Sequence, residues 1–302
     1  MSTSTHSATF RGAALVVVWS SGFLSAELGA AHADPGTLLA WRCLVTAVVL
    51  APWLPAACRL LDRRDWVRQA VVGVLCQALY LAGVVQAAAA GVPAGTSALV
   101  TSLQPAVVLV GAALAAGRRL TTVQVGGLLL GTAGVALTAV ADLRSGTALP
   151  TLALPFGAML ALTVGTLLQE RWSRPSGSSV PLLPSLAVQS LVTAGFAVGF
   201  AVPAGALAPP PVPGFWVAVG WGVLAGVSSY ALYYVVTARD GAGRVSTLLY
   251  LTPAVTTLWA LPLSGRTPPV LALLGLGVSG AAVALLHRSH RCSERVPVAF
   301  NG

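Results

Sequence analysis

The chain has 302 residues, of which 56% are hydrophobic and only 8% are charged. About a quarter of the residues of a soluble domain are charged, so this composition excludes an ordinary soluble globular protein and predicts an all-α integral membrane protein. The formal net charge is +9, but the arginines lie between apolar segments rather than in one patch, which argues against a nucleic-acid partner and indicates membrane topology.

Apolar segments of about 18 to 25 residues follow one another along the chain, each long enough to cross the hydrocarbon core of a bilayer as a helix. Their connections are short and rich in Pro, Gly or Arg, so we expect no inserted soluble domain. Cleavage of the first segment as a signal peptide near Ala31-His32-Ala33 is the alternative, but it would break the internal repeat described next. The ten expected transmembrane helices lie near 11–29, 36–57, 66–89, 93–116, 121–141, 150–171, 181–202, 214–237, 242–263 and 267–287.

The sequence contains a long internal repeat. Shifted by about 148 positions, the stretch 92–137 aligns without a gap on a second copy. Gly, Pro and Arg coincide as well as the common apolar residues, which indicates a duplication rather than chance. We therefore expect two five-helix repeats, 1–145 and 146–290, followed by a cytoplasmic tail, 291–302. The clearest matching pairs are Gln104-Pro105 with Thr252-Pro253, Gly117-Arg118 with Gly265-Arg266, and Gly127-Leu128 with Gly275-Leu276.

The arginines set the expected orientation. With the N-terminus in the cytoplasm, Arg144 and Arg266 fall outside, Arg42 lies within a segment, and the rest of the 17 basic residues fall on the cytoplasmic side. Both termini should therefore be cytoplasmic. Since each repeat has an odd number of helices, the second must enter the membrane from the opposite side, and such inverted repeats are typical of secondary transporters.

Several loose motifs, taken together in their order and spacing, resemble the drug/metabolite transporter superfamily, specifically its EamA-type members with ten helices. They are Trp19-Ser20-Ser21-Gly22-Phe23, Leu39-Ala40-Trp41-Arg42, the paired proline-containing helices at Pro105 and Pro253, and Gly165 to Arg171. The resemblance implies a secondary transporter, most often an exporter, for a small organic metabolite or drug. Where the family often carries Gly-Glu, this chain has Gly117-Arg118 and Gly265-Arg266, so no role is transferred to those positions.

Polar side chains and prolines within the segments give the candidate substrate site. Pro105 and Pro253 are expected to kink their helices, either as cavity-lining breaks or as purely structural bends. Ser97, Thr101 and Gln104 follow helical spacing and form one polar stripe, and Thr252 is the repeat equivalent of Gln104.

Aromatic and amide side chains complete this expected site. Gln77 and Tyr80 share a face of the third helix, and Tyr230 and Tyr233 share a face of the eighth. With Trp19 and Ser20 they would form a cavity suited to amphipathic organic solutes. An interfacial belt is the alternative for the tyrosines.

Two charged residues are candidates for special roles. Arg42 is expected to extend towards the outer membrane surface or to pair with Glu27, and contact with a substrate carboxylate is the alternative. Glu27 is the candidate coupling residue if it lies deep in the membrane. Because the segment centres otherwise hold only hydroxyls, amides and aromatics, we expect facilitated diffusion or exchange rather than obligatory proton coupling.

The remaining motifs indicate little further chemistry. No phosphate-binding loop or HExxH motif occurs, so we expect no enzyme activity and no cofactor, with an intramembrane enzyme and a non-transporting receptor or scaffold as alternatives. His287, His290 and Cys292 are read as part of a solvated basic tail rather than a metal site. The small-residue faces at Gly127-xxx-Gly131 and Gly275-xxx-Ser279 should pack helices within a monomer, a homodimer being the alternative.

Overall fold

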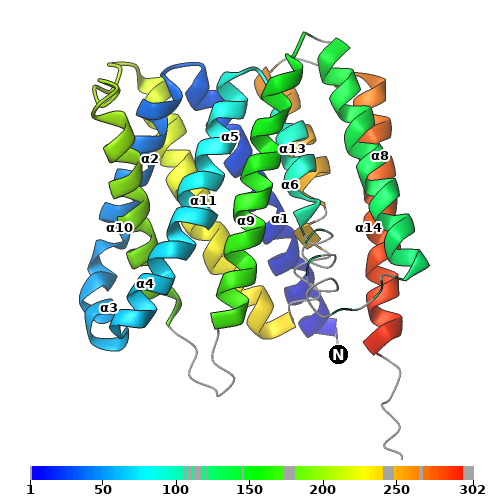
Figure 1. Cartoon of the computed structure of the whole chain (residues 1–302), viewed down its shortest axis with the longest axis horizontal. Coiled ribbons are helices and arrows are strands. Elements are labelled where there is room, and N and C mark those ends of the chain that lie inside the picture. Colours follow the sequence, from blue (N-terminus) through cyan, green and yellow to red (C-terminus); the bar gives the residue numbers. More distant parts are fainter. Residues whose placement is uncertain are drawn as a thin grey trace, which may run out of the picture.

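The computed structural model describes residues 2–104, 107, 111, 117, 119, 121–144, 146–172, 181–240, 248–249, 251–264 and 268–294. These residues form helices and turns and contain no β-strand, which confirms the all-α fold class. The helices stand side by side in one bundle, and the first turn of α1 and the last turn of α14 lie at the same end of it (Figure 1).

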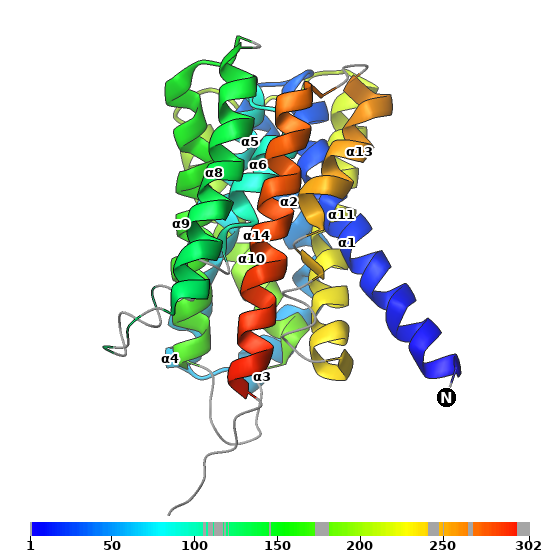
Figure 2. The ribbon, with the colours of Figure 1, turned by 90° about the vertical axis from the view of Figure 1, so that its right-hand side faces the viewer.

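The elements alternate long helices with short connections (Figures 1 and 2). The first half holds α1 (Ser2–Ala30), α2 (Pro35–Leu50), α3 (Leu54–Leu60), α4 (Arg63–Val72), α5 (Tyr80–Ala89), α6 (Ala94–Thr101) and α8 (Thr122–Arg144). The second holds α9 (Ala153–Trp172), α10 (Leu182–Ala201), α11 (Pro213–Asp240), α13 (Thr252–Ser264) and α14 (Val270–Glu294). Short 3₁₀ turns occupy Ala51–Trp53 and Leu149–Leu152, and Gly73–Leu79 is π-helical.

Local sequence explains several helix ends. Pro35 and Pro213 open α2 and α11, where the missing N–H has no helical partner to lose. The Asp62 carboxylate accepts a hydrogen bond from the backbone N–H of Asp65, at 2.7 Å, and so caps α4. Gly91 follows α5 with a φ of 83°, a conformation that favours glycine, and reverses the chain towards α6.

The helices agree with the expected apolar segments. Among the described residues, 6 helices are long and apolar enough to cross a membrane, and Val125–Ala141 and Val270–Ala282 are shorter apolar helices at two further expected positions. The protein is therefore a multi-pass membrane protein. The expected segments 93–116 and 242–263 are represented by α6 and α13, which cover only part of each range.

The backbone is interrupted directly after α6 and directly before α13. α6 ends at Thr101, and turn residues Ser102 and Leu103 follow it. Leu251 is likewise a turn residue, and α13 begins immediately after it. Pro253 is thus the second residue of a helix rather than a kink within one, because the first helical turn tolerates a missing N–H. Pro105 lies outside the described residues.

Helices α8 and α14 pack closely along their small-residue faces (Figure 2). A Cβ atom at Gly131 would contact the Ala282 Cβ, one at Gly134 would contact Ser279, and one at Gly275 would contact Thr138. These contacts run in opposite directions along the two helices, so α8 and α14 are antiparallel. The expectation that these faces pack within the chain is confirmed.

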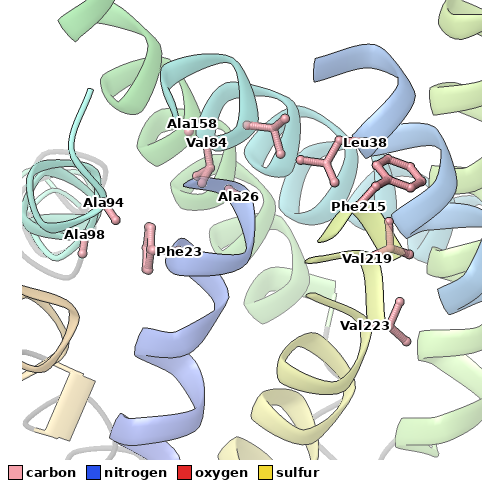
Figure 3. Close-up of a cluster of buried hydrophobic side chains, with 11 residues drawn as sticks. Phe23, Ala26, Leu38, Val84, Ala94, Ala98, Ala158, Phe215, Val219 and Val223 are labelled. Carbon is pink, nitrogen blue, oxygen red and sulfur yellow. The ribbon is translucent and has the colours of Figure 1, made fainter. Parts of the chain in front are cut away.

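A cluster of apolar side chains fills one end of the bundle (Figure 3). It brings together Phe23 near the end of α1, Leu38 near the start of α2 and Phe215 near the start of α11. Val84 on α5 and Ala94 on α6 join them, and both are buried. Burial of this apolar surface holds together the ends of helices from both halves of the chain.

Candidate functional site

A cavity with about 890 Å³ of empty space, its open mouth included, lies between helices of both halves. Its lining comes from α1, α2, the π-helical segment, α5, α10 and α11. Most of the lining is apolar or aromatic. Among the described residues, Arg42 is the one charged side chain in it. A cavity with a mostly apolar and aromatic lining and few polar groups has the character of a site for a small organic molecule.

Arg42 lies in the second turn of α2 and is 7% exposed. Its Nη1 donates a hydrogen bond to Ser25 Oγ at 3.3 Å, and a Cβ atom at Gly222 would lie 2.9 Å from its Nε. Glycine at position 222 therefore leaves room for the guanidinium against α11. The buried side chain lies in the wall of the cavity.

The expected pairing of Arg42 with Glu27 is wrong. Within the described residues the structure records no ion pair between them, and Glu27 Oε2 is buried with no hydrogen-bond partner. Although both residues lie near the same end of the bundle, Glu27 does not line the cavity and Arg42 does. Among the described residues, no carboxylate forms an ion pair with Arg42, which places a positive charge at the site.

Three glutamine side chains form a buried chain beside the cavity. Gln77 Nε2 donates to Gln189 Oε1 at 2.8 Å, and Gln189 Nε2 donates to Gln69 Oε1 at 2.7 Å. Thr193 Oγ1 also donates to the backbone oxygen of Gly73, the first residue of the π-helical segment. These bonds join α10 to the irregular third span, and π-helical turns are frequent at functional sites.

The aromatic wall is centred on Trp19. Its ring lies 6.0 Å from that of Tyr230 in an edge-to-face arrangement and 6.2 Å from that of Tyr233. Trp19, Tyr80 and Tyr230 all line the cavity, while Tyr233 packs behind Trp19. Such rings offer faces against which an apolar or aromatic solute can stack.

A smaller cavity, with about 380 Å³ of empty space when its open mouth is included, adjoins the first through Trp19 and Tyr80, which line both. Thr101, Gln104 and Thr252 also line it, at the interruptions of the two broken helices. Gln104 Nε2 donates to Thr166 Oγ1 at 3.0 Å. The polar ends of the broken helices therefore face a cavity, as they do at transporter sites.

Residues 8–140 match the model of the EamA-like transporter family. This part of the chain is an EamA-like transporter domain. No curated protein matches the chain. Among solved structures, one described as a crystal structure of a protein has 21% sequence identity, a TM-score of 0.62, and coverage of 96% of this chain and 99% of its own. That likeness shows the fold alone, while the EamA-like domain indicates a membrane transporter of the drug/metabolite type.

The EamA-like domain supplies much of the site predicted from the sequence. The larger cavity receives Trp19, Arg42, Gln77, Tyr80 and Tyr230, and the smaller one receives Trp19, Tyr80, Thr101, Gln104 and Thr252. Three other predicted residues line neither. Ser20 donates to the backbone oxygens of Val16 and Thr252, Ser97 Oγ is buried without a partner, and Tyr233 lies behind Trp19.

Some site residues were missed by the sequence reasoning, among them Gln189, Ser190 and Thr193 on α10. They lie outside the EamA-like domain, in the second half of the chain. Gln69 and Gln189 could have been found, since an amide within an apolar segment is a recognisable signal. Ser190 had no such signal, because hydroxyls are common in membrane helices.

Proposed function

We propose that the protein is a secondary transporter that moves a small organic metabolite or drug across the membrane by alternating access. The observation that carries this proposal is the cavity between helices of both halves, lined by Arg42, by aromatic rings and by Gln77. Substrate sites of secondary transporters lie at such an interface, near interrupted helices. Export is the proposed direction, on the ground of the family resemblance alone.

The proposed architecture is ten transmembrane helices in two inverted repeats, 1–145 and 146–290, with 291–302 as a cytoplasmic tail. The antiparallel packing of α8 on α14 supports it, because these two helices are repeat equivalents. Ser279 Oγ also donates to the backbone oxygen of Gly131, its own equivalent 148 positions earlier, as expected beside a twofold axis. The interruptions after Thr101 and at Leu251 occupy equivalent positions as well.

We place the protein in a bacterial plasma membrane with both termini in the cytoplasm. The common position of the α1 start and the α14 end in Figure 1 agrees with this, as does the distribution of arginines. Cysteines introduced near His32 or Pro210 should react with an impermeant reagent outside intact cells, and one introduced near Arg63 should not. Reaction of the Arg63 loop from outside would refute the orientation.

In this arrangement, the apolar cluster around Phe23 and Phe215 is the outer gate. Phe23 and Val84 belong both to the cluster and to the cavity lining, so the cluster borders the cavity at that end. Opening towards the outside would separate these side chains while α8 and α14 stay packed. We propose as the substrate-contacting set the predicted residues that line the two cavities: Trp19, Arg42, Gln77, Tyr80, Thr101, Gln104, Tyr230 and Thr252.

Solute flux in proteoliposomes tests the proposal. Vesicles with the protein should exchange a bound solute faster than protein-free vesicles, and crowding the cavity with Gly222→Leu should abolish that exchange. Gly220→Leu is the matched control, because a Cβ atom there meets no atom within 4 Å. Binding of solutes without any flux would favour the receptor alternative. We further propose that the protein acts as a monomer, since its small-residue faces are used within the chain.

A further inference from the structure

We infer that the ligand of the larger cavity is an amphipathic organic monoanion whose acidic group binds Arg42 and Ser190. This inference names the substrate class of the proposed transporter. Binding of the anion does not depend on the proposed transport function, whereas its transport does. The inference is carried by a buried cation and a buried hydroxyl in the wall of one cavity, the cation without a counter-ion and the hydroxyl without a hydrogen-bond partner among the described residues.

The charge of Arg42 calls for an external anion. A guanidinium has five N–H donors and stays charged in proteins, yet Arg42 makes one hydrogen bond, to Ser25, among the described residues. A charged side chain within a membrane is costly unless it is paired or hydrated. Because Arg42 lines the cavity, its remaining donors are available to a bound ligand, and a carboxylate can accept two of them at once.

Ser190 supplies a second, independent indication. Its buried Oγ has no hydrogen-bond partner among the residues that the structure describes, and Ser190 is 2% exposed while lining the same cavity. A buried polar group without a partner is rare in folded proteins, and a ligand is one of the things that satisfies it. Arg42 and Ser190 thus belong to one helix from each half of the chain, α2 and α10.

The rest of the lining selects the body of the ligand and its other charges. Trp19, Tyr80 and Tyr230 provide aromatic surface for an apolar or aromatic body. Among the described residues, the lining contains no Asp or Glu that could receive an ammonium group. An organic cation would meet the Arg42 charge without compensation, and a zwitterion would leave its ammonium unpaired, so a monoanion is favoured over both.

Three small probes with one aromatic body separate these cases: phenylpropionate, phenylalanine and phenethylammonium. Binding to the purified full-length protein near neutral pH is measured by the ligand-induced rise in melting temperature, which needs no transport. We expect phenylpropionate to bind at least about tenfold more tightly than either other probe, from the strength of a charged hydrogen bond. Equal binding of phenylalanine, tighter binding of phenethylammonium, or no binding of phenylpropionate would overturn the inference.

Variants assign the binding to the two residues. Arg42→Gln should weaken phenylpropionate binding by about ten- to a hundredfold and abolish the preference over phenethylammonium, while Arg42→Lys should keep part of that preference. Ser190→Ala should weaken binding by a smaller factor, and Arg59→Gln, at an exposed arginine on α3, should change nothing. Elution and ligand-free melting temperature establish that each variant is folded. A folded Arg42→Lys or Arg42→Gln variant that binds like the parent would refute the role of Arg42.

Flux measurements keep this inference separate from the proposed function. If phenylpropionate binds with the expected charge selectivity but shows no flux in proteoliposomes, the anion site is supported and transport of this probe is refuted. Flux of all three probes at equal rates would support a transporter and refute the charge selectivity.

Discussion

Replacing Gly134 by Ala should separate α8 from α14 and destabilise the protein. A Cβ atom at position 134 would lie 2.6 Å from the backbone oxygen of Gly275 and 2.7 Å from the backbone nitrogen of Ser279. Ordinary contacts of such an atom begin near 3.4 Å. Since both neighbours are backbone atoms, no side-chain rotation relieves the clash, and the two helices must move apart.

The expected magnitude follows from two opposing effects. Overpacking a tight contact costs about 1–3 kcal/mol, whereas exchanging Gly for Ala within a helix contributes up to about 1 kcal/mol of stability. Gly126→Ala on the same helix is the matched control, because a Cβ atom there meets nothing within 4 Å. The difference between the two variants isolates the overpacking effect, so Gly134→Ala should be less stable than Gly126→Ala by about 1–3 kcal/mol.

The assay is unfolding in mixed micelles by increasing sodium dodecyl sulfate, followed by the fluorescence of the 8 tryptophans. Gly275→Ala should behave like Gly134→Ala, because its Cβ atom would lie 2.5 Å from the backbone oxygen of Gly134. Equal stability of Gly134→Ala and Gly126→Ala would show that α8 and α14 do not pack in this register, and would remove the main support for inverted repeats.

Three further predictions concern the site. Gln189→Leu removes two hydrogen bonds between the three glutamines and should lower the free energy of unfolding by about 1–3 kcal/mol. Gln86→Leu, at an exposed amide, should leave it unchanged. Equal losses of stability in the two variants would refute a structural role for the three glutamines. Gln104→Ala and Tyr230→Phe should each slow solute flux several-fold at near-normal expression, and unchanged flux in both would place the site elsewhere. An imposed pH gradient should not drive solute accumulation, and accumulation that Glu27→Gln abolishes would instead identify Glu27 as a proton-coupling residue.

Much of the fold follows from the sequence because it depends on spacing along one chain. The apolar lengths predict the helices, and Gly127-xxx-Gly131 and Gly275-xxx-Ser279 predict that two of them pack closely within the chain, although not against which partner. Small residues have no rotamers to choose, so the antiparallel contact of α8 with α14 depends only on their position.

The site could be predicted less completely because its contacts join distant helices. Gln77 was expected to face a cavity, but its partner Gln189 lies 112 positions away on α10. The π-helical turn at Gly73 has no sequence signature, although it shifts every following side chain on that helix. Arg42 and Glu27 were expected to pair because they are close in depth, yet pairing also depends on helix rotation, which hydropathy does not give.

Side-specific modification of Cys76 tests the alternating-access account most directly. Cys76 lines the cavity and is 6% exposed, whereas Cys58 is exposed on α3. In variants that keep one cysteine each, an impermeant thiol reagent should modify Cys76 from either side of the membrane and Cys58 from the cytoplasmic side alone. Modification of Cys76 from one side only, in vesicles that exchange solute, would contradict the account.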